Sequence, residues 1–154
     1  VHHTRKLDAR LAQALMSIQS VKAVEVGRGV RAGMLRGSQM HDELFYAAAR
    51  GYFRRTNNAG GIEGGMSNGS DIIIRATMKP IATIRKPLRS INLRTRKEER
   101  ASFERSDVCA VPAGSVIGEA AVAFELTRAL LEKCGGDSRK EFLRNYRGYL
   151  KQIG

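Results

Sequence analysis

The chain has 154 residues, a formal net charge of +12, 42% hydrophobic residues and 27% charged residues, so it is long enough to bury a core and has the composition of an ordinary globular domain. Its apolar runs are too short to cross a bilayer, and two cysteines, Cys109 and Cys134, are too few for a disulfide framework, which favours a reducing cytoplasm. We therefore expect a single cytoplasmic domain, residues 1–154, with no membrane partner and with an anionic partner for its surplus of Lys and Arg.

The positive charge leaves two classes of anionic partner open. Lys and Arg are scattered along the chain, with one denser patch over residues 85–100, and no nucleic-acid-binding motif is recognisable. Aromatic residues make up only 6% of the chain and tryptophan is absent, so bases would find few side chains to stack on. Small anionic ligands are favoured and no nucleic acid is expected, while a basic nucleic-acid-binding module remains the alternative.

The N-terminal part of the chain combines helical and extended patterns. Apolar residues recur at helical spacing over residues 7–18 and predict a helix there. The β-branched run 21–26 predicts a strand that ends at Gly27, and residues 30–35 predict a short strand that pairs back on it. A polar loop is expected over residues 37–43.

His41 stands beside two carboxylates, Asp42 and Glu43, which raises the question of a metal site or a proton shuttle. One histidine with two adjacent carboxylates and no second histidine nearby does not have the spacing of a metal-ligand set. We interpret these residues as part of a solvated loop without a catalytic role.

Residues 54–69 hold five glycines and three asparagines, so they can be neither a regular helix nor a central strand. Glycine and asparagine tolerate positive φ, which allows neighbouring N–H groups to converge on an anion. Arg54 and Arg55 open the segment and suit phosphate or carboxylate groups. Two interpretations stay open, an anion-binding cradle and a flexible surface loop. The segment does not match the common nucleotide-binding glycine patterns.

A strand is predicted over residues 71–78, directly after the glycine-rich segment, and its consecutive apolar residues indicate burial. Pro80 should end the strand, because proline has a fixed φ and lacks an N–H donor. Lys79 lies at the end of this strand and suits phosphate binding as a compact positive charge, although a solvated lysine is the commoner case there.

The remaining part of the chain begins with a basic ribbon over residues 84–97, in which we expect an exposed edge strand. A long helix is predicted over residues 115–133 and a double glycine ends it. A last helix begins near Ser138, which starts a capping-box pattern. We interpret Cys109 as a small buried hydrophobic residue rather than a nucleophile. Helices at both ends of the chain with strands between them predict an α+β fold.

Four blocks of the sequence resemble the chorismate synthase family. They are Leu-Asp-Ala-Arg-Leu-Ala at 7–12, Arg-Thr-Asn-Asn-Ala-Gly-Gly-Ile-Glu-Gly-Gly-Met-Ser-Asn-Gly at 55–69, Met-Lys-Pro-Ile at 78–81 and Glu-Arg-Ser-Asp-Val-Cys-Ala-Val-Pro at 104–112. The blocks come in the family's order and cover the chain nearly end to end. The family's N-terminal Gly-Glu-Ser-His-Gly-like block has no counterpart here, so the resemblance implies the C-terminal portion of a chorismate synthase.

The resemblance implies antiparallel β-sheets sandwiching α-helices and a homotetramer whose flavin sites draw on a neighbouring subunit. The implied reaction is the reduced-FMN-dependent 1,4-elimination of phosphate from 5-enolpyruvylshikimate 3-phosphate. Its product is chorismate, at the last common step of the shikimate pathway to aromatic amino acids. NADPH, through a separate reductase, is one candidate source of the reduced flavin. Because some of the family's catalytic residues have no counterpart here, we expect this portion to be inactive alone; an inactive structural half-domain is a further alternative.

The resemblance also implies roles for individual residues. The expected FMN contacts are Gln19, Ser20, Gly64, Lys79, Pro80, Ile81, Ala82, Thr83 and Arg105. Asp107 is expected to assist proton transfer at the flavin N5 atom. Arg54 and Arg55 are expected to bind the substrate because of their charge and position, independently of the resemblance. No metal ion is expected.

Overall fold

The structure, a computed structural model, describes residues 2–105 and 108–153. The helices are η1 (His3–Arg5), α1 (Leu7–Met16), η2 (Gly29–Met34), α2 (Gly37–Met40), α3 (Val111–Cys134) and α4 (Arg139–Ile153), where η marks a 3₁₀ helix. The strands are β1 (Val21–Val26), β2 (Leu44–Ala47), β3 (Gly51–Arg54), β4 (Ile62–Glu63), β5 (Met66–Ser67), β6 (Ile74–Met78), β7 (Arg89–Ile91) and β8 (Glu98–Arg100). These strands form two-stranded antiparallel sheets, β1–β6, β2–β3, β4–β5 and β7–β8.

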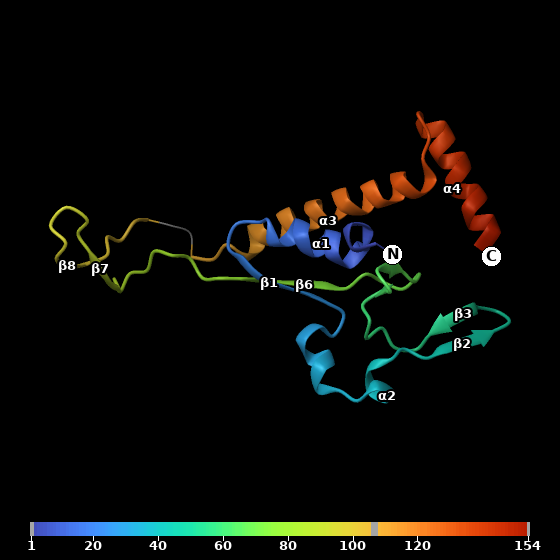
Figure 1. Cartoon of the computed structure of the whole chain (residues 1–154), viewed down its shortest axis with the longest axis horizontal. Helices are drawn as coiled ribbons and strands as arrows, with labels where there is room; N and C mark the ends of the chain where they lie inside the picture. The colour runs from blue at the N-terminus through green and yellow to red at the C-terminus, as the bar shows by residue number, and fades with distance from the viewer. Residues whose placement is uncertain (1, 106–107, 154) are drawn as a thin grey trace.

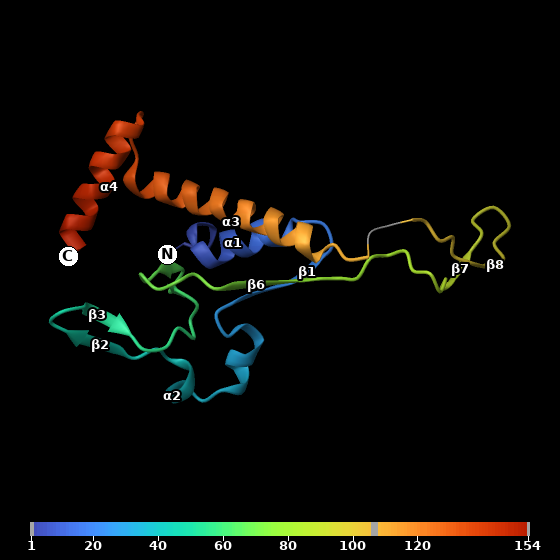
Figure 2. The same cartoon turned by 180° about the vertical axis from the view of Figure 1, so that it is seen from behind.

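The molecule is elongated (Figures 1 and 2). In the middle of the molecule, helices α1 and α3 run beside the β1–β6 ribbon. The β7–β8 hairpin projects from one end of the molecule. Helix α4 and the β2–β3 hairpin lie at the other end, near both chain termini. The predicted α+β class, with antiparallel sheets packed against helices, is confirmed.

Helix α1 supplies the centre of the core. Leu7, Leu11 and Leu15 follow one another at four-residue spacing, so they share one helix face, and all three are buried. Leu11 is completely buried and packs with Ile62 against partly buried side chains of β6 and α3. On α3, Gly118 faces Leu15, where an added Cβ would lie 3.3 Å from Leu15 Cδ2. A glycine there lets α1 and α3 approach closely.

The β1–β6 ribbon connects distant parts of the sequence. Its antiparallel register pairs Val21 with Met78 and Val26 with Ile74. The predicted strand over 21–26 is confirmed, whereas the strand predicted over 71–78 begins only at Ile74. The strand ends before Pro80, as expected from the missing donor.

Two predictions between β1 and β2 are wrong. Residues 30–35 do not form a strand; most of this stretch lies in the 3₁₀ helix η2. Glu25 Oε1 accepts the N–H of Val30 at 3.0 Å and holds the chain in a turn, and β6 already occupies the paired edge of β1. The expected polar loop over 37–43 contains the short helix α2, which Gln39 caps by accepting the Arg36 N–H at 3.2 Å.

The boundaries of the C-terminal helices follow their capping chemistry. Helix α3 starts at Val111 rather than Ser115, because Pro112 suits the first helical turn and the Ser115 hydroxyl donates to the Pro112 carbonyl at 2.8 Å. It ends at Cys134 and is capped by Gly135, whose φ is +60°. Before α4, Ser138 Oγ accepts the Glu141 N–H at 3.2 Å, as the capping pattern predicts. None of the described helices combines the length and apolarity that a membrane span requires.

Candidate functional site

Seven of the nine expected flavin contacts gather at one end of the β1–β6 ribbon. The turn at Ser20 leads into β1 and Lys79 follows β6, so the ribbon's register places them opposite each other. The Lys79 N–H donates to the Ser20 carbonyl at 2.8 Å. Ser20 has a φ of +70°, which is uncommon for a residue other than glycine and marks a tight turn.

Thr83 joins this end of the ribbon to the segment that carries Arg105. Its hydroxyl donates to the Glu104 carbonyl at 3.2 Å and accepts the Glu104 N–H at 3.0 Å. This double contact places residues 79–83 beside Arg105, although about twenty residues of the β7–β8 arm separate them in sequence.

A cavity of about 730 Å³ opens between these two segments. It is lined by Pro80, Ile81, Thr83, Ile84, Arg85, Phe103, Arg105 and Val108. The lining combines two guanidinium groups with aliphatic and aromatic side chains. Such a mixture can take a ligand that has both a planar apolar part and an anionic part. We call this set of residues, with Gln19, Ser20, Lys79 and Ala82, the ribbon-end cluster.

The glycine-rich segment is not a flexible surface loop. Asn58, Gly60 and Gly61 are buried, and the N–H of Gly60 donates to the Asn57 carbonyl at 3.2 Å. Asn57 also accepts the Gly61 N–H at its Oδ1 atom (2.8 Å) and donates from Nδ2 to the Asp71 carbonyl (2.8 Å). The segment is therefore folded against the start of β6 by a closed set of hydrogen bonds.

The anion at the centre of this segment belongs to the protein itself. The Asp42 carboxylate accepts the Asn58 N–H at 2.8 Å, the Ala59 N–H at 2.9 Å and the Thr56 hydroxyl at 2.6 Å. The backbone donors that the sequence suggested for a phosphate are therefore already bound to a carboxylate. The interpretation of Asp42 as part of a solvated loop missed this role, since nothing in the sequence links residue 42 to residues 56–59.

The surroundings of Asp42 keep it ionised. Burial alone would raise the pKa of its carboxyl group, because a low-dielectric environment disfavours charge. The hydrogen bonds from Ala59, Thr56 and Asn58 outweigh burial. With the positive charge of Arg54 nearby, they hold the pKa of Asp42 below its ordinary value.

Arg54 and Arg55 both make contacts within this chain. Arg54 Nη2 lies 2.8 Å from Glu63 Oε2 in an ion pair, and its Nε atom is buried without a hydrogen-bond partner among the described residues. The Arg55 guanidinium lies over the ring of Phe45, 4.2 Å from the ring centroid, while its residue stays exposed.

Gly64 turns the chain between β4 and β5, away from the ribbon-end cluster. Its φ is +57° and no atom lies within 4 Å of the place where a Cβ would stand, so the surface in front of it is open. The Ile73 N–H, just before β6, donates to the Gly60 carbonyl at 3.1 Å. Lys79, just after β6, follows Ile73 by six residues. At roughly 3.3 Å per residue, about 20 Å of strand separates the two groups of residues. A single chain does not bring Gly64, Arg54 and Arg55 to the ribbon-end cluster.

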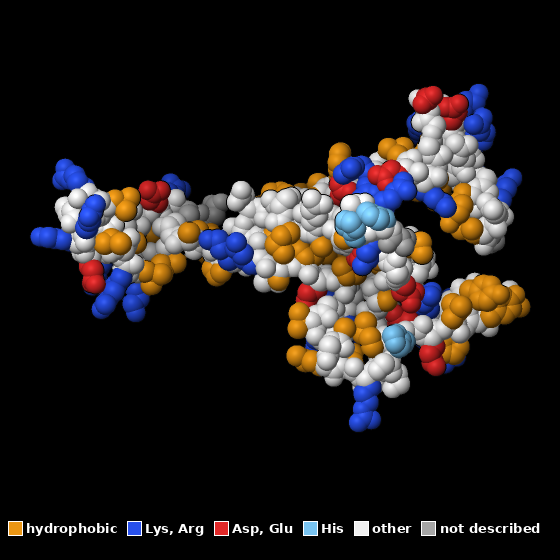
Figure 3. Space-filling model, viewed as in Figure 1, with side chains coloured by type: hydrophobic (Ala, Val, Ile, Leu, Met, Phe, Trp, Pro, Cys, Tyr) orange, Lys and Arg blue, Asp and Glu red, His pale blue; other side chains and the backbone are white. Residues whose placement is uncertain are grey.

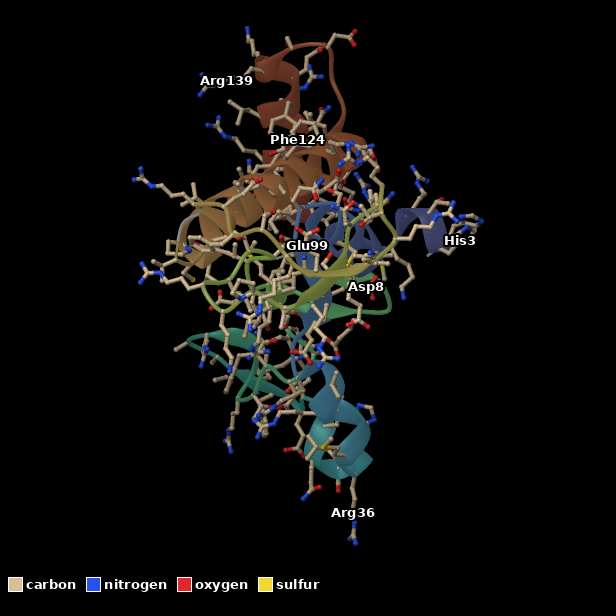
Figure 4. The ribbon with its side chains drawn as sticks, turned by 90° about the vertical axis from the view of Figure 1, so that its left-hand side faces the viewer. His3, Asp8, Arg36, Glu99, Phe124 and Arg139 are labelled. Carbon is tan, nitrogen blue, oxygen red and sulfur yellow. The ribbon has the colours of Figure 1, made fainter. Side chains whose placement is uncertain are left out.

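Asp107, the expected proton-transfer residue, lies outside the described residues. Cys109, expected to be buried, is exposed. His41 takes part in no group of three or more metal-ligating side chains, and the part of the chain that the structure describes holds no such group. Figure 4 shows His3 at the edge of the molecule, pointing outward.

Basic side chains occur at several ends of the molecule rather than on one face. In Figure 3 they surround the β7–β8 arm and also appear on the helical body and below it. Figure 4, viewed along the arm, shows Arg36 at one extreme and Arg139 at the opposite one, with Glu99 in front. This distribution differs from the continuous basic stripe that follows a nucleic-acid backbone.

Comparison with known proteins assigns the chain to a family. The chorismate synthase family profile matches residues 1–131. The chain is 58% identical over 153 residues to the chorismate synthase of Symbiobacterium thermophilum, covering 99% of the chain and 39% of that protein. It is 56% identical over 160 residues to that of Geobacter sulfurreducens, covering 99% of the chain and 41% of that protein.

A solved structure gives the same assignment. The crystal structure of a chorismate synthase superimposes with a TM-score of 0.77 at 39% sequence identity, covering 99% of this chain and 37% of the other. The chain thus spans about two fifths of the length of the curated relatives that it matches. Both its sequence and its fold show that this chain belongs to the chorismate synthase family.

Proposed function

We propose that this chain contributes the ribbon-end part of the active site in a chorismate synthase. That enzyme would eliminate phosphate and a ring proton from 5-enolpyruvylshikimate 3-phosphate to give chorismate. The observation that carries the proposal is the pair of contacts, Ser20 to Lys79 and Thr83 to Glu104, that gathers family-matched residues around one cavity.

The donor set of the ribbon-end cluster fits FMN. The cavity of about 730 Å³ offers apolar side chains for a ring system and guanidinium groups for a phosphate. Lys79 would add a compact positive charge at the cavity's edge. The contacts proposed for FMN are Gln19, Ser20, Gly64, Lys79, Pro80, Ile81, Ala82, Thr83 and Arg105. Reduced FMN, when bound, would lend electron density to the allylic C–O bond as the phosphate leaves; NADPH, through a separate reductase, is the candidate source of that reducing power.

In this proposal, arginine side chains of the chain bind the phosphate and carboxylate groups of the substrate. Substrate and cofactor together bring two phosphates and two carboxylates, and a leaving phosphate is stabilised by fixed donors aimed at it. Arg105 is a donor beside the cavity. Arg54 and Arg55 are proposed as substrate contacts from the glycine-rich segment. Arg55 is the better placed of the two, since it is an exposed residue without an ion pair among the described residues, while Arg54 is paired with Glu63.

Asp107 is proposed to receive or relay the ring proton near the flavin N5 atom. The family resemblance of residues 104–112 supports this role. A carboxylate at that point would supply general-base assistance, which contributes about 10²–10⁴-fold in rate where it operates.

The complete site requires more than one copy of this chain's residues, or residues outside the chain. About 20 Å of strand between Ile73, where the glycine-rich segment is hydrogen-bonded, and Lys79 of the ribbon-end cluster supports this proposal. We propose a cytoplasmic homotetramer in which neighbouring subunits share the flavin sites. The 154 residues alone, which span two fifths of their relatives, are proposed to be inactive.

Turnover in the complete protein that carries this chain tests the proposal. With reduced FMN under anaerobic conditions, we expect phosphate release and chorismate formation in equal amounts. Asp107→Asn should lower kcat by about 100-fold while the Kd for FMN stays within about twofold. Glu104→Gln is the matched control, because Glu104 contacts Thr83 only through its backbone. Unchanged turnover in Asp107→Asn would remove Asp107 from the mechanism, and absence of flavin-dependent phosphate release would overturn the proposed function.

A further inference from the structure

The fold holds the glycine-rich segment through one half-buried carboxylate, Asp42, that family resemblance does not single out. Asp42 accepts three hydrogen bonds from three consecutive parts of that segment, the Thr56 hydroxyl at 2.6 Å, the Asn58 N–H at 2.8 Å and the Ala59 N–H at 2.9 Å. Hydrogen bonds to an ionised carboxylate are stronger than bonds between neutral groups. Its neighbour Glu43 is exposed.

The segment that Asp42 holds, residues 56–61, continues directly into the turn that contains Gly64. The segment it fixes leads into β4, and the Asn68 N–H donates to the Gly61 carbonyl at 3.0 Å, which closes the β4–β5 unit onto it. Glu63, next to Gly64, pairs with Arg54 at 2.8 Å and accepts from Asn68 Nδ2 at 2.6 Å. A displacement of residues 56–61 would therefore move the Gly64 turn as well.

Close packing and further hydrogen bonds leave the backbone of residues 56–61 little room to move toward another acceptor if the Asp42 carboxylate is lost. Gly60 packs so closely on Gly27 that an added Cβ would lie 2.4 Å from Gly27 N. Arg28 donates from Nε to Asn58 Oδ1 at 2.7 Å and from its backbone N–H to the Asn58 carbonyl at 2.8 Å. Asp42 is the only carboxylate hydrogen-bonded to residues 56–61 in the described part of the chain.

We propose that Asp42 is a positioning residue of the flavin site: its three hydrogen bonds fix residues 56–61 and thereby set the place of Gly64 against the cofactor. The inference rests on the proposed function, because it takes Gly64 to be a flavin contact. Asp42 itself touches neither flavin nor substrate and acts only through the backbone that it holds.

The test uses the complete protein with Asp42→Asn and the neighbouring Glu43→Gln as the matched loss of a carboxylate. Amide hydrogen exchange reports on Asn58 and Ala59, FMN titration gives Kd, and steady-state kinetics give kcat at saturating FMN. In Asp42→Asn we expect both amides to exchange about tenfold faster and Kd to rise about tenfold, with kcat nearly unchanged. A rise in the Kd for FMN without a fall in kcat identifies Asp42 as a positioning residue. Glu43→Gln should leave all three quantities unchanged.

Two less disruptive variants at Thr56 test the same hydrogen bond if Asp42→Asn does not fold. Thr56→Val removes only the 2.6 Å hydroxyl bond and keeps the side-chain shape, while Thr56→Ser keeps the bond. We expect Kd for FMN to rise about threefold in Thr56→Val and to return to the unsubstituted value in Thr56→Ser.

The outcomes separate this inference from the proposed function. Faster exchange at Asn58 and Ala59 with an unchanged Kd for FMN would overturn the positioning role and leave the proposed function intact. If the unsubstituted protein binds no FMN, the proposed function fails and the inference fails with it, whatever the exchange rates are. Exchange rates unaffected by Asp42→Asn would show that the carboxylate does not hold the segment, which also overturns the inference.

Discussion

Gly27 and Gly60 bring two backbone segments into direct contact. A Cβ on Gly27 would lie 2.1 Å from the Asn58 carbonyl oxygen, and the φ of Gly27 is +58°. The Gly27 N–H donates to the Ile73 carbonyl at 2.9 Å, so the same residue also ties β1 to the start of β6. Glycine is required here for both space and backbone conformation.

Gly27→Ala is therefore expected to destabilise the fold by about 2–4 kcal/mol, as the sum of left-handed strain and a backbone clash. Gly33→Ala is the control, because no atom lies within 4 Å of its added Cβ. Denaturant unfolding of both variants measures the difference. Equal stabilities of the two variants would contradict the close approach of Gly27 and Asn58.

A partly buried ion network joins α1 to α3. Glu125 Oε2 accepts from Arg10 Nε at 3.2 Å and Glu125 Oε1 accepts from Arg128 Nη1 at 2.7 Å. Burial would raise the pKa of Glu125, but the hydrogen bonds and charges of the two arginines outweigh it and lower that pKa below its ordinary value. A carboxyl group with a lowered folded-state pKa stabilises the protein above its unfolded pKa, and this stabilisation is lost as pH falls through the folded pKa.

Stability should therefore decrease below about pH 4–5, and Glu125→Gln should flatten that decrease while lowering stability near neutral pH by about 1–3 kcal/mol. Glu119→Gln, on an exposed position of the same helix, should leave the pH dependence unchanged. Chemical unfolding from pH 3 to pH 7 gives the comparison. A slope in Glu125→Gln equal to that of the unsubstituted protein would mean that Glu125 is not a source of the acid sensitivity.

The regular elements could be predicted from sequence where one periodic pattern dominated. Helix α1 and strand β1 followed from the spacing of leucines and from β-branched residues, and the end of β6 followed from Pro80. Element η2 was predicted wrongly as a strand because its conformation depends on the Glu25 side chain, a contact that propensity does not encode. The start of α3 was misplaced because Ser115 bonds backward to Pro112 instead of capping the helix.

The candidate site likewise contains residues that the sequence indicates and residues whose role only the folded chain reveals. The family resemblance indicated residues 79–83 and Arg105, and the register of β1 and β6 then explains why Ser20 faces Lys79. The role of Asp42 could not be predicted, because its partners lie fourteen to seventeen positions away in sequence and only the folded chain brings them together. The glycine-rich segment forms neither a regular helix nor a central strand, as predicted, but it contains the short strands β4 and β5, and its donors bind an internal anion.

Thr83 is the contact that joins the two segments of the ribbon-end cluster. Thr83→Val keeps the side-chain shape but leaves both backbone groups of Glu104 without their partner. We expect the Kd for FMN to rise about tenfold in the complete protein, because Arg105 is no longer held beside residues 79–83. Thr83→Ser should restore the affinity. Equal affinities in Thr83→Val and Thr83→Ser would show that this hydroxyl does not organise the cofactor site.

The whole molecule exposes more apolar surface than a chain of this length normally leaves to water. Five hydrophobic side chains are buried among the described residues, while Val108 is 99% exposed, Leu93 92% and Met34 79%. The rings of Tyr46 and Tyr52 lie tilted against each other, with centroids 5.1 Å apart, on an exposed face of the β2–β3 hairpin. Apolar surface of this extent is typical of interfaces, which agrees with the proposal that neighbouring subunits complete the site.

The central claim is that the ribbon-end cluster and the Gly64 turn, which one chain holds apart, serve one flavin in the assembled protein. A structure of the complete protein with bound FMN tests it most directly. We predict that each FMN contacts residues 79–83 and Arg105, and that the Gly64 turn of a neighbouring subunit lies against the same cofactor. FMN bound away from residues 79–83 and Arg105 would contradict the claim.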